Sequence, residues 1–219
     1  MRMRREEPSD ARLGAAKTLG LTRSRAWATV VIGLAASLTG CSKTLNWEEE
    51  VALSPTDTIW ITRTVDYERG GSAGNPLDIV WLGRRFVLEF NWRGKTYHFE
   101  QHGAPMVLRV DATGQPVILG PADAGAWYAQ NHYACTTPYY VQFVPDATGK
   151  QWTWPISVDP AFYGIETNLL QVLPSPGAGK ARYSAQELKS ANVAVLGRSP
   201  QRLRIEPTYT GDHCRGKGK

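Results

Sequence analysis

The chain has 219 residues, of which 42% are hydrophobic and 21% are charged, and this composition excludes a disordered, collagen-like or coiled-coil protein. Its 21 glycines, 14 prolines, eight Trp, nine Tyr and five Phe favour many short strands joined by turns. The net charge of +5 arises almost wholly in residues 1–40, which carry seven basic and three acidic residues, against 18 and 17 in residues 41–219. A nucleic-acid partner is therefore not expected.

The first element is an uncharged segment, residues 26–42, that follows the basic stretch Thr22–Arg25. Its apolar part, Ala26–Leu38, is shorter than the about 20 residues that a membrane-spanning helix needs, and it contains Gly33 and Ser37. A basic region followed by a short apolar region is the layout of a secretory signal. We therefore expect residues 1–40 to be a signal peptide.

The segment ends in Leu38-Thr39-Gly40-Cys41, which resembles the lipobox of bacterial lipoproteins. The resemblance implies cleavage before Cys41, a diacylglycerol on its thiol and a further acyl chain such as palmitate on its amino group. Two or three acyl chains anchor a protein firmly, because a single chain gives only marginal membrane binding. Ser42, in place of an aspartate, favours the outer membrane over the inner one. We expect a domain that faces the periplasm, with the membrane as one partner and an envelope protein or a glycan as another.

Residues 41–56 are predicted to be a lipidated tether, and residues 57–219 a single β-rich domain. Within it, Asp57–Tyr67 alternates β-branched and other residues, which predicts a strand. The glycine-rich segment Gly70–Pro76 predicts a loop, and Leu77–Leu82 returns to strand character.

Three hairpins follow. Strand Arg85–Trp92 places four apolar side chains on one face, turns at residues 93–95 and returns as Thr96–Gln101. The other two share the turn sequence Asp-Ala-Thr-Gly, at residues 111–114 between strands 106–110 and 116–119, and at residues 146–149 between strands 139–144 and 150–154. In each turn Asp can accept bonds from the backbone ahead of it and Gly can take a positive φ.

Helix signals are few. Ser184-Ala-Gln-Glu187 forms a capping box that predicts a helix of about two turns ending near Asn192, and Gln201–Glu206 is predicted to be the last strand. The fold expected from these elements is mainly β, an antiparallel β-sandwich or barrel with one short helix near the C-terminus.

With Cys41 lipidated, Cys135 and Cys214 remain as a pair in an exported chain, which predicts a disulfide. It would close a loop of about 80 residues and stabilise the fold by about 4 kcal/mol in the chain-entropy model. The alternative, a catalytic thiolate at Cys135 assisted by His132, has no family signature around it.

One stripe of side chains suggests a metal site. On a strand, His98, Glu100 and His102 face the same way, while Tyr97 and Phe99 face the other. Residues two apart on a strand are separated by about 6.5–7 Å, so two of them can converge on an ion and three converge with strain. The alternative is a solvated polar face. No cofactor is expected.

Aromatic residues are the remaining candidates for recognition. Exposed Trp and Tyr side chains could stack on sugars or peptides of the envelope, although aromatics that alternate along strands are usually core. The residues concerned are Trp127, Tyr128, Tyr133, Tyr139, Tyr140, Trp152, Trp154, Phe162 and Tyr163.

Together these features predict a non-enzymatic, membrane-tethered binding or accessory protein. Two alternatives stay open. One is a metal-dependent hydrolase or another envelope enzyme that uses His98, Glu100 and His102, and the other is a structural component of an envelope assembly.

Overall fold

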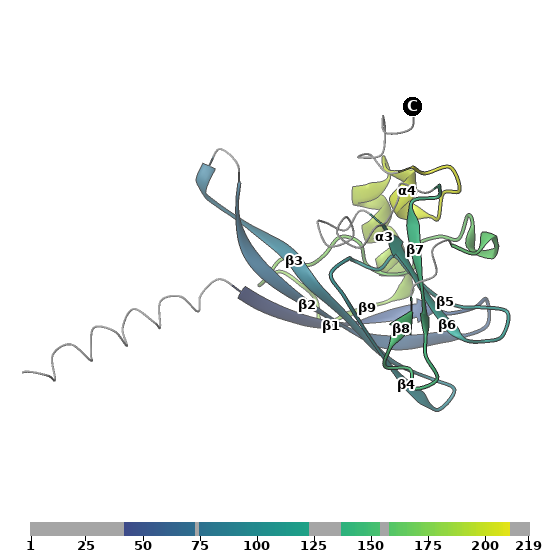
Figure 1. The fold of residues 1–219 in the computed structure, drawn as a ribbon. Helices are drawn as coiled ribbons and strands as arrows, with labels where there is room; N and C mark the ends of the chain where they lie inside the picture. Colours follow the sequence, from purple (N-terminus) through teal and green to yellow (C-terminus); the bar gives the residue numbers. More distant parts are fainter. Residues whose placement is uncertain (1–41, 73–74, 123–136, 154–157, 211–219) are drawn as a thin grey trace, which may run out of the picture. The chain divides into compact units, whose positions relative to one another are not determined.

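The computed structural model describes residues 42–72, 75–122, 137–153 and 158–210, all of which lie in one compact unit, Cys41–Lys219. Its strands form two sheets (Figure 1). The first has the order β4-β3-β2-β1-β9, with β1 (Ser42–Ala52), β2 (Thr58–Ser72), β3 (Asn75–Trp92), β4 (Lys95–Gln101) and β9 (Arg182–Tyr183). The second has the order β5-β6-β7-β8, with β5 (Val107–Val110), β6 (Pro116–Pro121), β7 (Tyr140–Pro145) and β8 (Trp152–Thr153).

The two sheets share one apolar core. Its fully buried members come from both sheets, and they include Ile61, Leu88 and Phe99 of the first and Leu108, Ile118 and Phe143 of the second. Neither strand order closes on itself, so the arrangement is that of a sandwich and not of a barrel. The prediction of a mainly β fold with a helix near the C-terminus is confirmed.

The three predicted hairpins are present. Strands β3 and β4 are joined at Arg93 and Gly94, both of which have positive φ, 49° and 75°. In the Asp-Ala-Thr-Gly turns, the carboxylate of Asp111 accepts bonds from the backbone N–H groups of Thr113 and Gln115, and that of Asp146 does the same at its own turn. Gly114 and Gly149 take φ values of 80° and 77°, as their turn chemistry predicts.

The first strand, β1, lies where the sequence predicts a tether. Most of the predicted tether, residues 41–56, is part of the domain: β1 occupies Ser42–Ala52 and lies between β2 and β9 in the first sheet. Trp47, Glu49 and Val51 alternate as its buried residues. The run Glu48-Glu49-Glu50 hides this alternation in the sequence, because one of its three acids points into the core.

The segment predicted to be a loop, Gly70–Pro76, also differs. Strand β2 continues to Ser72 and β3 begins at Asn75, with Gly70 paired to Val80 and Gly71 paired to Ile79. Glycine is tolerated in this ladder because the Leu82 side chain covers Gly70, where an added Cβ would lie 2.9 Å from Leu82 Cδ1. We call this extension, residues 68–72 and 75–84, the β2–β3 arm.

The C-terminal part contains α3 (Ala185–Leu196), α4 (Pro200–Leu203) and a short 3₁₀ helix, η2 (Pro160–Phe162). The capping box is confirmed, since Ser184 and Glu187 bond each other's backbone N–H groups, and α3 continues past Asn192. The predicted strand Gln201–Glu206 is wrong. Pro200 begins α4 instead, and after it Arg204 forms an isolated antiparallel bridge with Glu166.

A buried ion pair joins the first sheet to the C-terminal half. The carboxylate of Glu49 lies 3.1 Å from Arg63 Nη1, and neither side chain has any exposed surface. Glu49 also accepts bonds from Trp47 Nε1, at 2.6 Å, and from the backbone N–H of Leu170, at 3.0 Å. Arg63 in turn donates to the Leu170 carbonyl at 2.6 Å. The pair therefore fixes β1, β2 and the segment at Leu170 together.

We expect Glu49→Leu to lower the free energy of unfolding by about 3–5 kcal/mol, because it leaves the buried Arg63 guanidinium without its counter-charge. The double variant Glu49→Leu, Arg63→Met should recover most of that loss, since it removes both charges. Urea unfolding measures both, with Lys189→Ala, which breaks an exposed pair with Glu166, as the control. A single variant as stable as the wild type would contradict this assignment.

Candidate functional site

The predicted stripe lies on the solvent side of β4. Tyr97 and Phe99 are buried on the opposite face, as the alternation predicts. His98 Nδ1 lies 3.0 Å from a carboxylate oxygen of Glu89 on β3, and His98 Nε2 lies 3.7 Å from a carboxylate oxygen of Glu100. The structure thus brings His98 and Glu100 together and adds Glu89, which the sequence pattern did not single out.

Glu100 is engaged by a cation. Arg85 on β3 binds both of its carboxylate oxygens, at 2.7 and 2.8 Å, and reaches Asp66 of β2 at 2.9 Å. The bond from Arg85 holds the pKa of Glu100 below its usual range. A hydrogen bond from the Thr44 hydroxyl and, to a smaller degree, the bond from Arg85 lower the pKa of Asp66. This face therefore carries a cross-strand charge network that binds Glu100 to a guanidinium.

The third predicted ligand is held elsewhere. His102 Nδ1 lies 2.9 Å from the backbone carbonyl oxygen of Arg84. Within the described ranges, no group of three or more His, Cys, Asp or Glu side chains is arranged to hold a metal ion. The geometry gives the metal hypothesis at His98, Glu100 and His102 no support, and it stays an untested prediction.

The charge network predicts a pH dependence. Because its carboxylates have lowered pKa values in the folded state, their contribution to stability is present above about pH 5 and is lost as the pH falls below about 4. We expect Arg85→Met to cost about 1 kcal/mol or less at neutral pH, since the Arg85 and Glu100 side chains are more than a third exposed and solvent screens them. Urea unfolding should show this difference shrinking in acid. The control is Arg198→Met, at an exposed position after α3. A stability difference between the wild type and Arg85→Met that grows in acid would contradict the network.

A groove of about 330 Å³ runs along the edge of β1. Its β1 side is lined by Leu45, Asn46 and Trp47, and its other side by the segment that leads into β9, with Pro174, Gly177, Gly179, Lys180 and Ala181. β9 covers the β1 edge at Glu48 and Glu49, and the Glu48 N–H donates to the Ala181 carbonyl at 2.9 Å. The groove thus opens where that pairing ends. Gly177-Ala-Gly-Lys180 is its rim, and the Lys180 ammonium there is bonded to Glu187 at 2.7 Å.

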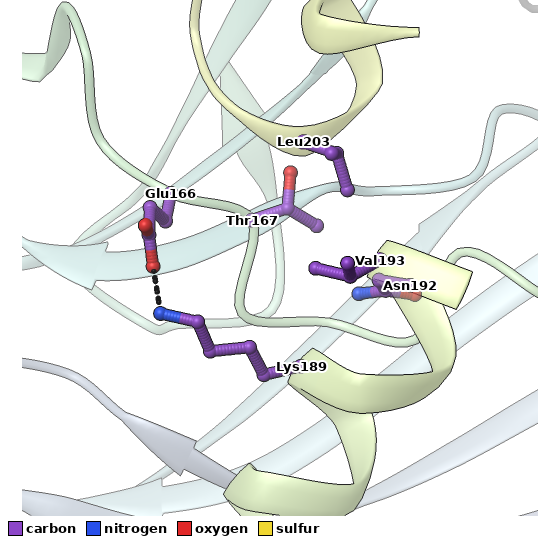
Figure 2. Close-up of a pocket in the computed structure, with 6 residues that line it drawn as sticks. All are labelled: Glu166, Thr167, Lys189, Asn192, Val193 and Leu203. Atoms are coloured by element: carbon purple, nitrogen blue, oxygen red, sulfur yellow. Dashed lines mark hydrogen bonds and ion pairs between the residues drawn. The ribbon is translucent and has the colours of Figure 1, made fainter. Parts of the chain in front are cut away.

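A smaller pocket, of about 80 Å³, lies between α3, α4 and the segment at Thr167 (Figure 2). At one side of this pocket the Lys189 ammonium donates to the Glu166 carboxylate, at 2.8 Å (Figure 2). Thr167 donates to the Arg202 carbonyl, and the buried Asn192 side chain bonds the backbone of Leu169 and Gln171. The volume is below the about 300 Å³ at which ligand pockets begin, so the pocket is too small for a typical ligand.

The described aromatic residues are mostly core. Tyr139, Tyr140 and Phe162 are buried, and the partly buried Trp152 donates its Nε1–H to the His98 carbonyl at 2.7 Å. Stacking on a glycan is therefore not a role for these three buried rings. Trp127, Tyr128, Tyr133 and Trp154 lie outside the described residues, as do Cys41, His132, Cys135 and Cys214. The lipidation and the disulfide stay predictions.

The β2–β3 arm carries apolar surface that the sequence interpretation did not single out. Val80 and Leu82 are each 41% exposed. On the other face Trp81 is partly buried, and Lys43 Nζ lies 5.1 Å from its ring centroid. The signal was present as Leu77-Asp-Ile-Val-Trp-Leu82, in which five of six residues are apolar.

Comparison with family models, with curated proteins and with solved structures finds no match for the chain. Among the described residues, no helix is long and apolar enough to cross a membrane. The chain's own surfaces are therefore the guide to its function.

Proposed function

We propose that the protein is a lipid-anchored envelope lipoprotein that acts by binding, as an accessory domain on the periplasmic side of the outer membrane. Acyl chains on Cys41 hold the β-sandwich at the lipid surface, while residues 1–40 are removed as the signal peptide. The groove at the β1 edge and the β2–β3 arm are the surfaces available to a partner.

The observation that carries this proposal is the position at which the compact unit with the described strands begins. The compact unit starts at Cys41, and β1 is paired from Ser42 onward. Cleavage between Gly40 and Cys41 would leave every described strand and helix in the mature chain. This boundary supports the lipobox as a processing site, because cleavage there removes none of the described strands.

An exposed apolar patch favours a second candidate, a structural component of an envelope assembly. Val80 and Leu82 lie on the solvent side of the arm. Exposed apolar side chains that lie together on a projecting element mark contact surfaces. In this second candidate the protein has the same lipid anchor, and the arm contacts another component of the assembly.

The intact mass of the protein purified from membranes tests the anchor. We expect the mass of residues 41–219 plus acyl chains, two hydrogens lighter before reduction if Cys135 and Cys214 are joined. Cys41→Ala should abolish acylation and cleavage. Cys214→Ser is the control and should leave both intact. A wild-type chain of full length without acyl chains would overturn the proposal.

A further inference from the structure

The β2–β3 arm extends past the residue that bears the lipid. β1 and β2 are antiparallel, and Ser42, the first residue of β1, pairs with Glu68. Because the strands run in opposite directions, the part of β2 after Glu68, up to Ser72, extends beyond Ser42 on the side on which Cys41 precedes it in the chain. Four further residues of strand reach about 13 Å. Figure 1 shows the start of β1 and the end of the arm at the same end of the first sheet.

The arm exposes apolar side chains on one of its faces. Val80 and Leu82 are exposed there, whereas Trp81, on the other face, is partly buried and packs against the core cluster that includes Tyr67 and Phe86. The cross-strand neighbour of Val80 on β2 is Gly70, which has no side chain to cover it. Because the other face already packs on the protein, exposed apolar side chains on the solvent face suit an element that meets a second apolar environment there.

Cations flank these apolar residues. Lys43 lies over the Trp81 ring, Arg69 is exposed opposite Trp81, and Arg84 forms an ion pair with Glu68 at 3.0 Å. Tryptophan with lysine and arginine beside it is the composition found at the headgroup level of membranes, where the ring lies among the headgroups and the cations meet anionic lipid. Long basic side chains can reach that level while their stems stay on apolar surface.

We propose that the β2–β3 arm is a second membrane contact, which places Val80, Trp81 and Leu82 at the headgroup level of an anionic bilayer beside the lipid on Cys41. This inference rests on the proposed lipidation. Adjacent Cα atoms are 3.8 Å apart, and β1 leaves no slack after Cys41, so an anchored Cys41 brings the arm to the lipid surface. A protein partner would first have to displace lipid from it.

The experiment uses the acylated protein from membranes, reconstituted into vesicles that contain phosphatidylglycerol and phosphatidylcholine brominated near the headgroup. Tryptophan emission should be quenched in the wild type, and Trp81→Phe should lose most of the quenchable emission. Trp60→Phe is the matched control and should keep it, because Trp60 is 41% exposed but lies at the far end of β2, opposite Glu50.

A second variant covers the case in which Trp81→Phe disturbs the fold. Val80→Asp with Leu82→Asp changes only exposed side chains, so the near-UV circular dichroism should stay unchanged while quenching falls severalfold. Equal quenching in the acylated wild type and in both arm variants would overturn the arm contact and leave the lipoprotein proposal standing. An intact mass without acyl chains would instead overturn the lipoprotein proposal, and the arm contact with it.

Discussion

The buried pair of Glu49 and Arg63 is the constraint on which the first sheet depends. Two charges without exposed surface are costly to desolvate, and the cost is offset only when geometry and additional hydrogen bonds are good. Here Trp47 and the backbone of Leu170 supply bonds to the carboxylate, while Arg63 Nε and Nη2 are buried without a hydrogen-bond partner. A slip of β1 by one residue would turn Glu48 or Glu50 inward and Trp47 outward, so the pair also selects the register among three consecutive acids.

Local chemistry made part of the fold predictable. The Asp-Ala-Thr-Gly turns and the capping box at Ser184 act over three to five residues, and each is found where the sequence indicates it. Period-two alternation also gave the correct face for His98 and Glu100. These features need no knowledge of which strands are neighbours.

The remaining features depend on partners far away in the chain. The sequence of β1 suggests a polar tether. Glu49 can point into the core only because it bonds Arg63 and Leu170, which are distant in the chain. At the candidate metal stripe, Glu100 is bound by Arg85 because β3 and β4 pair in one register, and no spacing within β4 reveals that register. Gly70 suggests a loop in the sequence. The Leu82 side chain that covers it belongs to the next strand, so the local sequence does not reveal that contact.

The parallel pairing of β9 with β1 has a consequence for the order of folding. Arg182 and Glu48 are 134 residues apart, and Glu49 takes one of its bonds from Leu170. In a chain synthesised from its N-terminus, β1 emerges well before the residues that complete its edge and donate a bond to its buried carboxylate. Contacts of such high sequence separation form late. Under the proposed processing, cleavage before Cys41 would therefore precede the completion of the β1 edge.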